Sequence, residues 1–433
     1  MNSLNISPEG LSYKNNYLIA FFLLLILVKC FDLIGFTGTP IVLLGLGIMI
    51  CTYIKSKADV CRNKQLIGIL WLMIMGSVCF SFLINKQSFL RVTLESYFAM
   101  GLGSFFLFRY LNLSFNNSLK LIKNFSILFC ICYIIQWLVY PFNIFSASLD
   151  TTTIGADWFR MRMACSTCSY CLYFYGINEY MKNHSFKSLI YMVIGFLPFI
   201  IMGFRSLVFL TVIFTIYLLI AYNKTSIMKM FSYFLFWGFA SLIVIQTSLF
   251  QLKFNEMMDR QESDQTFDNK DYVRYASLSY YSQVFDTPAE RFFGGGVPLT
   301  SVKKMNWKGR YVSEMNKGYQ KNLYWNDLGI IGWGFIFGFP SVALLSFLII
   351  RVVLRCKEKE LLFIRVTLLT VYLGSLFTSQ ELYRSGNLSF LGLLFYAEFV
   401  YHKEKRNYRI KEMLNIDFSI QKNENKNSVF CSV

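Results

Sequence analysis

The chain consists of long runs of apolar residues separated by short polar connections. An apolar run of about 20 residues has the length that crosses the hydrocarbon core of a bilayer as a helix. The pattern therefore predicts an all-α fold, a polytopic integral membrane protein. Twelve runs are predicted to be transmembrane helices: 16–36, 38–54, 65–84, 89–109, 123–145, 163–181, 187–204, 206–222, 230–250, 326–350, 361–379 and 386–401.

Two long polar segments interrupt this pattern and divide the chain. Residues 1–250 hold predicted spans one to nine, and 251–325 form one large loop. Spans ten to twelve occupy 326–401, and a basic tail follows over 402–433. The tail is first Lys- and Arg-rich and then Asn- and Lys-rich, a composition that predicts a disordered end.

The distribution of Lys and Arg predicts how the chain lies in the membrane. One alternating set of connections, including both ends, holds 23 of these residues, and the short connections of the other set hold six. Cytoplasmic connections carry the excess of positive charge, and long loops do not follow this rule. Both termini are therefore predicted to be cytoplasmic, and loop 251–325 is predicted to lie outside the membrane.

Composition supports the same class. Of 433 residues, 55% are hydrophobic and 15% are charged, against about 25% charged in an ordinary soluble domain. The net charge of +17 is typical of cytoplasmic loops in a membrane protein. Because no nucleic-acid-binding motif accompanies it, nucleic acid is not an expected partner.

A Cys-x-x-Cys-x-x-Cys motif spans residues 165–171. Its spacing places three thiols along one side of a helix, with neither a histidine nor a fourth ligand nearby. A helix contact made by small residues is favoured over a metal site.

Several arginines break the predicted charge distribution because they fall on the outer side. A guanidinium group suits phosphate oxygens in bidentate geometry, so one interpretation is a site for a diphosphate lipid. The alternative is contact with ordinary lipid headgroups of the outer leaflet. These arginines are Arg160, Arg162, Arg205 and Arg384.

The large loop carries further candidate residues. Residues 271–285 have the pattern of an amphipathic helix bearing Arg274. Three consecutive glycines, Gly294, Gly295 and Gly296, permit unusual backbone conformations and close approach to a ligand. Aromatic residues up to Trp325 alternate with basic ones. They are candidates for packing on sugar rings, and an interfacial aromatic belt is the alternative.

Some motifs are missing from the sequence. It has no Gly-x4-Gly-Lys-Ser/Thr phosphate loop and no Asp-x-Asp pair, and its two histidines, His184 and His402, fall on the predicted cytoplasmic side. ATP hydrolysis and histidine-ligated zinc chemistry are not expected, and neither a metal nor another cofactor is predicted.

Three segments, in this order, resemble the O-antigen polymerase and ligase superfamily of bacterial envelope enzymes. The likeness covers roughly residues 155–400 and the twelve-span layout. The segments are Gly203-Phe-Arg205-Ser206-Leu, Arg274 followed by Phe293-Gly-Gly-Gly296, and Tyr324-Trp-Asn-Asp327-Leu-Gly329-Ile-Ile-Gly332.

The resemblance implies a GT-C-like membrane glycosyltransferase that uses an undecaprenyl-diphosphate-linked sugar donor without a metal. Arg205, Arg274 and either Arg160 or Arg162 match arginines that hold the diphosphate in the family. The ligases of the family carry a His-Asn pair where this chain has Gly318-Tyr319-Gln-Lys-Asn. This difference favours a Wzy-type repeat-unit polymerase, although the arginine-x10-glycine repeats of some polymerases are absent.

In such a reaction an acceptor hydroxyl attacks the anomeric carbon and expels the lipid diphosphate, whose growing charge arginines stabilise. Asp327 is the candidate base and Tyr324 its candidate orienting partner. Asp327 alternatively caps the tenth helix near its N-terminus. Gly294, Gly295, Gly296, Trp325 and Arg384 are the candidate substrate-binding residues.

The sequence thus predicts an oligosaccharide polymerase of the bacterial cytoplasmic membrane. Its expected partners are an undecaprenyl-diphosphate-linked oligosaccharide and membrane lipids, with a chain-length regulator protein as a candidate. A ligase-like glycosyltransferase and a lipid-linked oligosaccharide flippase remain the alternatives. A flippase is expected to place charges through the depth of the membrane, whereas the candidate charges here lie mostly on the outer side.

Overall fold

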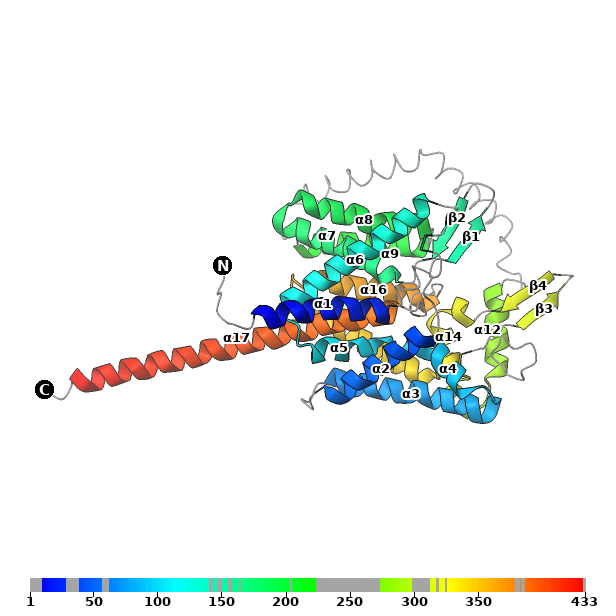
Figure 1. Ribbon diagram of the computed structural model, residues 1–433, viewed down its shortest axis with the longest axis horizontal. Coiled ribbons are helices and arrows are strands. Elements are labelled where there is room, and N and C mark those ends of the chain that lie inside the picture. The colour runs from blue at the N-terminus through cyan, green and yellow to red at the C-terminus, as the bar shows by residue number, and fades with distance from the viewer. Residues whose placement is uncertain are drawn as a thin grey trace.

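A computed structural model gives the arrangement of the chain (Figure 1). It describes residues 10–28, 39–56, 62–139, 142, 144–145, 150–154, 158–162, 165–202, 205–222, 273–297, 312–316, 319–323, 325–377, 382 and 386–430. Helices dominate these residues, in agreement with the predicted all-α class, and two short hairpins accompany them. The predicted span 230–250 lies outside the described residues.

The N-terminal part contains apolar helices and one helix that is broken. Its elements are α1 (Gly10–Leu27), α2 (Thr39–Lys55), α3 (Arg62–Asn85), α4 (Phe89–Glu95), η2 (Ser96–Gly103), α5 (Ser104–Tyr110) and α6 (Phe115–Leu138). The prediction of one continuous span over 89–109 was wrong, because the 3-10 helix η2 interrupts it.

Close packing accounts for this break. All of η2 is buried, and a Cβ atom on Gly101 would lie 2.7 Å from the backbone N of Ser389. The Ser104 hydroxyl donates to the Ser389 carbonyl at 2.5 Å. The glycines therefore let the tightened segment lie directly against the last helix of the chain.

The middle part begins with a hairpin and continues into three helices. Strands β1 (Asp150–Ile154) and β2 (Trp158–Arg162) pair antiparallel, and α7 (Ser166–Asn183), α8 (Phe186–Met202) and α9 (Arg205–Tyr222) follow. Helices α7 and α8 are antiparallel neighbours, since the Ser169 hydroxyl donates to the Gly195 carbonyl at 2.6 Å and Gly176 meets Met192 and Ser188. Cys165, Cys168 and Cys171 are all fully buried around the start of α7, as the helix-contact interpretation expects.

The C-terminal part contains the second hairpin and the longest helix. Its elements are α12 (Val273–Val284), α13 (Pro288–Phe293), β3 (Val312–Asn316), β4 (Tyr319–Leu323), η3 (Trp325–Leu328), α14 (Ile330–Phe337), α15 (Phe339–Arg355), α16 (Leu362–Phe377) and α17 (Asn387–Phe430). The span predicted over 326–350 is divided, because Gly338 has a φ of 83° between α14 and α15.

The tail prediction was also wrong, because α17 continues as a helix to Phe430. Figure 1 shows it leaving the body on the side opposite the two hairpins. The C-terminal part of α17 is polar and has few apolar side chains to bury. Such a segment can still form a helix, since Glu, Lys, Arg and Gln have good intrinsic helix propensity.

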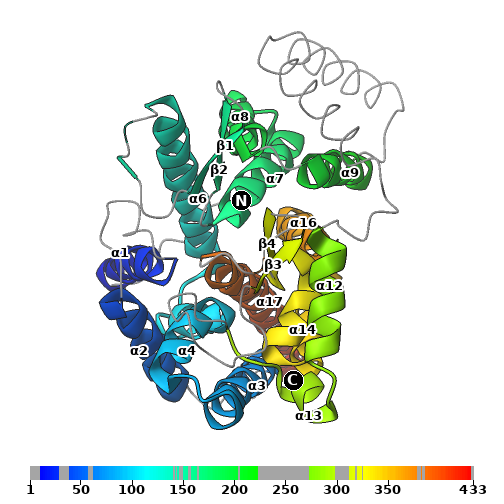
Figure 2. The ribbon, with the colours of Figure 1, turned by 90° about the vertical axis from the view of Figure 1, so that its right-hand side faces the viewer.

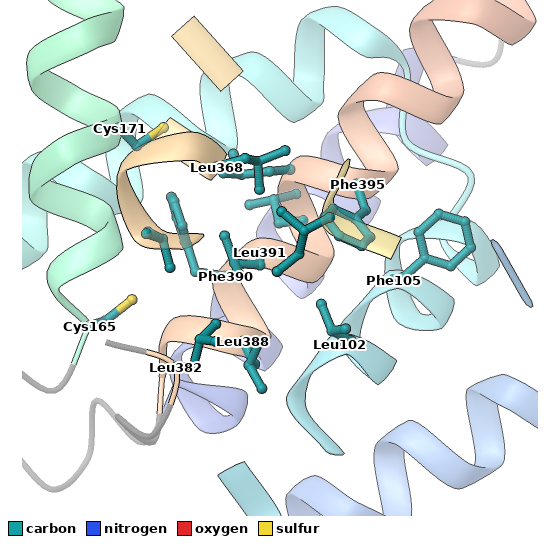
Figure 3. Packing of buried hydrophobic residues seen from close by; sticks show 14 of the residues in the cluster. Leu102, Phe105, Cys165, Cys171, Leu368, Leu382, Leu388, Phe390, Leu391 and Phe395 are labelled. Atoms are coloured by element: carbon teal, nitrogen blue, oxygen red, sulfur yellow. The ribbon is translucent and has the colours of Figure 1, made fainter. Parts of the chain in front are cut away.

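The first half of α17 is the centre of the hydrophobic core. Figure 3 shows Leu388, Leu391 and Phe395 of α17 among Leu102, Phe105 and Leu368 from neighbouring elements, and all are fully buried. These contacts join parts of the chain that lie almost 300 residues apart, so the core forms one continuous cluster.

The outer surface of the helices is apolar as well. Large apolar side chains are exposed along several of them, among them Phe22 (59%), Leu72 (73%) and Phe209 (66%). Within the described residues, α3 and α6 have the length and composition to cross a membrane, and the other apolar helices are shorter. Buried helices of soluble proteins share these properties, so the twelve-span layout stays a prediction.

Candidate functional site

The predicted diphosphate site falls at the end of the body that carries the two hairpins, here called the hairpin end (Figures 1 and 2). Strand β2 holds Arg160 and Arg162, whose Cα atoms pair in register with those of Thr152 and Asp150. Helix α7 starts directly after β2, and the antiparallel α8 returns to contact it. Helix α9 then begins at Arg205, so three of the predicted arginines lie on backbone segments at this end.

Helix α12 brings a fourth predicted arginine, Arg274, to the same end. Its anchor is Tyr281, which is fully buried and stacks on Phe335 of α14 with ring centroids 5.7 Å apart. Phe285 stacks on the same ring at 5.8 Å. Helix α12 also contacts η3 and β4, and η3 contains Asp327. The segments bearing Arg274 and the candidate base are therefore neighbours.

The glycine turn has a clear structural explanation. Helix α13 is preceded by a capping box, in which the Thr287 side chain and Glu290 bond each other's backbone amides. The amides of Gly295 and Gly296 then donate to the carbonyls of Phe335 and Ile336, both at 2.9 Å. The turn thus joins α13 to α14 by two backbone hydrogen bonds to carbonyls at the C-terminal end of α14.

Positive φ values at Gly294 (72°) and Gly296 (75°) make this joint possible. A Cβ atom on Gly294 would lie 2.4 Å from the Ile336 carbonyl oxygen. All three glycines are buried. The close approach predicted for a ligand is made here by α14 and α3, and contact between these glycines and a substrate stays a prediction.

Trp325 is also built into the core. It is 4% exposed, and its ring stacks on Phe98 with centroids 6.2 Å apart and planes 21° apart. This contact fixes η3 against η2. The indole is therefore almost completely covered by protein, and contact between Trp325 and a sugar stays a prediction.

The remaining predicted residues are described in part or not at all. Tyr324 and Arg384 lie outside the described residues. Asp327 is placed only by its backbone in η3, and the N-cap of α14 is Gly329. Asp327 thus precedes the N-cap position of α14 by two residues and does not occupy it.

A second candidate site lies where α17 leaves the body. A cavity of about 980 Å³ opens between the ends of α2, α3, α5, α15 and α17, and we call it the basic cavity. Lining side chains include Tyr396, Phe399 and His402. Seven lining residues are cationic: Lys55, Arg62, Arg109, Arg351, Arg355, Lys403 and Arg406.

The contacts around the basic cavity are electrostatic. The Arg355 Nε atom lies 2.6 Å from a carboxylate oxygen of Glu398, which is fully buried. Arg351 donates to the Asn63 side chain, and Arg109 lies 5.7 Å from the ring centre of Phe399. Burial lowers the pKa of His402, which favours the neutral form of this ring.

Only part of this cavity could be predicted from the sequence. The excess of Lys and Arg on the predicted cytoplasmic side was visible, but the chain positions 55–63, 109, 351–355 and 396–406 are far apart. Only the packing of α17 against α5 and α15 brings these groups around one space.

Comparison with known proteins adds no family assignment. A scan against protein-family models gave no match, and neither did a search of curated proteins. Among the described residues, no group of three His, Cys, Asp or Glu side chains is placed to hold a metal ion.

Proposed function

We propose that this chain is a membrane glycosyltransferase that polymerises oligosaccharide repeat units. In this proposal it transfers glycan from an undecaprenyl-diphosphate-linked donor to a second lipid-linked repeat unit at the outer face of the bacterial cytoplasmic membrane. The hairpin end faces outward, and the basic cavity faces the cytoplasm.

The observation that carries the proposal is that four predicted site segments lie at the hairpin end of the body, where α12 contacts η3. Strand β2, the start of α9, α12 and η3 come from four separate parts of the chain between residues 158 and 328. They carry Arg160 or Arg162, Arg205, Arg274 and Asp327. A site that binds an anionic leaving group beside a base needs both kinds of group at one place.

Two further observations support a membrane location. Exposed apolar side chains lie along α1, α3 and α9, and extended exposed apolar surface is typical of contact with lipid. The cationic residues of the basic cavity gather at the opposite end from the hairpins. This agrees with the excess of positive charge on the cytoplasmic side of membrane proteins.

The chemistry follows from the proposed arrangement. A hydroxyl oxygen of the acceptor sugar bonds to the anomeric carbon of the donor while the bond from that carbon to the diphosphate oxygen breaks. Asp327 takes the hydroxyl proton, and the arginines stabilise the negative charge on the leaving diphosphate. The energy comes from the sugar–diphosphate bond, so no further co-reactant is required.

Purified protein in vesicles tests the proposal. Supplied with lipid-linked repeat units, EDTA and neither ATP nor a sugar nucleotide, it is expected to produce a ladder of longer lipid-linked glycans. Transfer to a lipid A-like acceptor without a ladder would instead indicate a ligase. Movement of unmodified repeat units across the vesicle membrane would indicate a flippase, and either result overturns the polymerase proposal.

A further inference from the structure

The basic cavity has two layers of positive charge. Arg109, Arg351 and Arg355 are half-buried and form its inner wall. Four cations at the rim are exposed: Lys55, Arg62, Lys403 and Arg406. Like charges brought together around one space repel each other, and burial weakens the screening by water. An anion in the cavity would relieve this repulsion.

Three acidic residues that the structure describes at this end bond groups outside the cavity lining. Glu358 bonds Lys405 at 2.7 Å, and Glu404 accepts a hydrogen bond from the Phe115 amide at 3.0 Å. Glu360 accepts from the Tyr401 hydroxyl at 3.2 Å. None of the described side chains that line the cavity is acidic.

Among the described acids, Glu398 contacts Arg355 of the inner wall. It lies behind Arg355, fully buried, and contacts its Nε atom. A guanidinium group has five N–H donors in a fixed plane. The ion pair at Nε therefore orients Arg355 and leaves its terminal nitrogens able to bind an oxyanion.

The residues that line the basic cavity indicate which class of ligand it would bind. Five of the seven cations are arginines, whose forked geometry matches phosphate oxygens. The volume of about 980 Å³ lies at the upper end of the range of small-molecule sites, roughly 300–1,000 Å³. The cavity therefore has room for more than one phosphate group.

We propose that the basic cavity is a binding site for a phosphate-bearing anion, separate from the reaction at the hairpin end. The ligand is either the headgroup of an anionic lipid or a soluble phosphate compound. Lipid headgroups of this kind bind in basic pockets between helices at the cytoplasmic face of membrane proteins. The positive-inside rule explains the presence of cations at this end but not their convergence around one cavity.

Binding to two probes distinguishes these sources. The full-length protein in neutral detergent is titrated with inorganic pyrophosphate and, separately, with dihexanoyl-phosphatidylglycerol at constant ionic strength. Dihexanoyl-phosphatidylcholine serves as the zwitterionic reference. Saturable binding of pyrophosphate alone, weakened by substitution of the rim residues, identifies a soluble ligand of the cavity rather than binding at the proposed diphosphate site of the hairpin end. Saturable binding of the glycerol lipid, weakened in the same way, identifies a headgroup site.

A triple variant of exposed rim residues tests the location without disturbing the inner ion pair. Arg62→Gln, Lys403→Gln and Arg406→Gln together are expected to weaken binding of the preferred probe about 100-fold, since each cation near an anionic group contributes roughly fivefold. The matched control replaces three exposed lysines that do not line the cavity, Lys120, Lys187 and Lys357, by Gln.

The control is expected to bind within about twofold of the unaltered protein. Circular dichroism and gel filtration establish that both triple variants are folded. Absence of saturable binding to either probe, or an equal loss in the control variant, would overturn the proposal. Neither measurement depends on glycan synthesis, so the result is independent of the proposed polymerase activity.

Discussion

The hairpin end and the basic end of the helical body are stabilised in different ways. At the hairpin end, backbone bonds at Gly295 and Gly296 and stacked rings around Phe335 fix short segments against each other. At the basic end, cations surround a cavity and one buried carboxylate, Glu398, faces them. The first arrangement fixes the backbone of exposed segments, and the second concentrates charge around a space. Backbone geometry is therefore the main constraint at the first end, and charge is the main constraint at the second.

The largest effect is expected from the arginines of the hairpin end. Arg205→Ala and Arg274→Ala should each reduce polymerisation by about 10²–10³-fold, or roughly 3–4 kcal/mol, because each removes a charge-assisted contact to the leaving diphosphate. Arg→Lys should also reduce it strongly, since lysine keeps the charge but loses the fork. The rate of ladder formation by purified variants measures both.

Lys359→Ala is the control for these variants, because Lys359 is exposed at the opposite end. Full-length ladders from both Arg205→Lys and Arg274→Lys would contradict the diphosphate role. Such a result would favour simple anchoring to lipid headgroups.

Substitution of a closely packed glycine at the hairpin end should lower stability more than substitution of a glycine with open space around it. Gly338 has a φ of 83°, and a Cβ atom there would lie 1.8 Å from the Phe292 carbonyl oxygen. Gly338→Ala is expected to lower the free energy of unfolding by about 3 kcal/mol through backbone strain and overpacking. Gly47→Ala is the matched change, because nothing lies within 4 Å of its added Cβ. It should stabilise α2 by about 0.5–1 kcal/mol, and thermal unfolding in detergent compares the two.

Breaking the ion pair of the basic end should have a smaller effect. Arg355→Ala leaves the fully buried Glu398 without its nearest cation. Complete burial of both partners would give a loss of about 3–5 kcal/mol, but the Arg355 side chain is 39% exposed, so we expect about 2 kcal/mol. The double variant Arg355→Ala/Glu398→Gln should recover most of that stability, because it removes the buried charge. If the double variant is no more stable than Arg355→Ala, the buried carboxylate is not the cause.

The smallest effect concerns the exposed pair Lys405–Glu358. Lys405 lowers the pKa of Glu358 by its hydrogen bond, so the pair stabilises the fold above the ordinary pKa of Glu358. That stabilisation is lost as the pH falls through the lowered pKa. Lys405→Ala should cost at most about 1 kcal/mol at pH 7, and the difference from the unaltered protein should vanish at lower pH. Thermal unfolding at pH 7 and pH 3 measures it; a difference that grows in acid would contradict the assignment.

The apolar pattern was sufficient to predict most of the described helices and the all-α fold class, but not where the helices break. The apolar run 89–109 is continuous in sequence, and its interruption at η2 depends on contacts between Gly101 and Ser389, almost 300 residues away. The division at Gly338 likewise depends on Phe292. The packing partners leave no local signal, although Gly338 and Pro340 mark a helix boundary in the sequence itself.

The candidate site shows the same limit. The sequence indicated which arginines are unusual, because Arg160, Arg162 and Arg205 oppose the overall charge distribution. It could not show that the glycine triplet packs against α14, since φ values and backbone hydrogen bonds depend on the tertiary fold. It also could not show the basic cavity, whose cations come from five helices.

The proposed function requires that the hairpin end and the basic end face opposite sides of the membrane. Labelling of single cysteines by a membrane-impermeant maleimide in intact cells measures this directly, after all 11 native cysteines are replaced by Ala. Ala289→Cys on α13 and Lys403→Cys on α17 introduce thiols at exposed positions. With the proposed orientation, position 289 is labelled in intact cells, and position 403 is labelled only after lysis. Labelling of both in intact cells, or of position 403 alone, would contradict it.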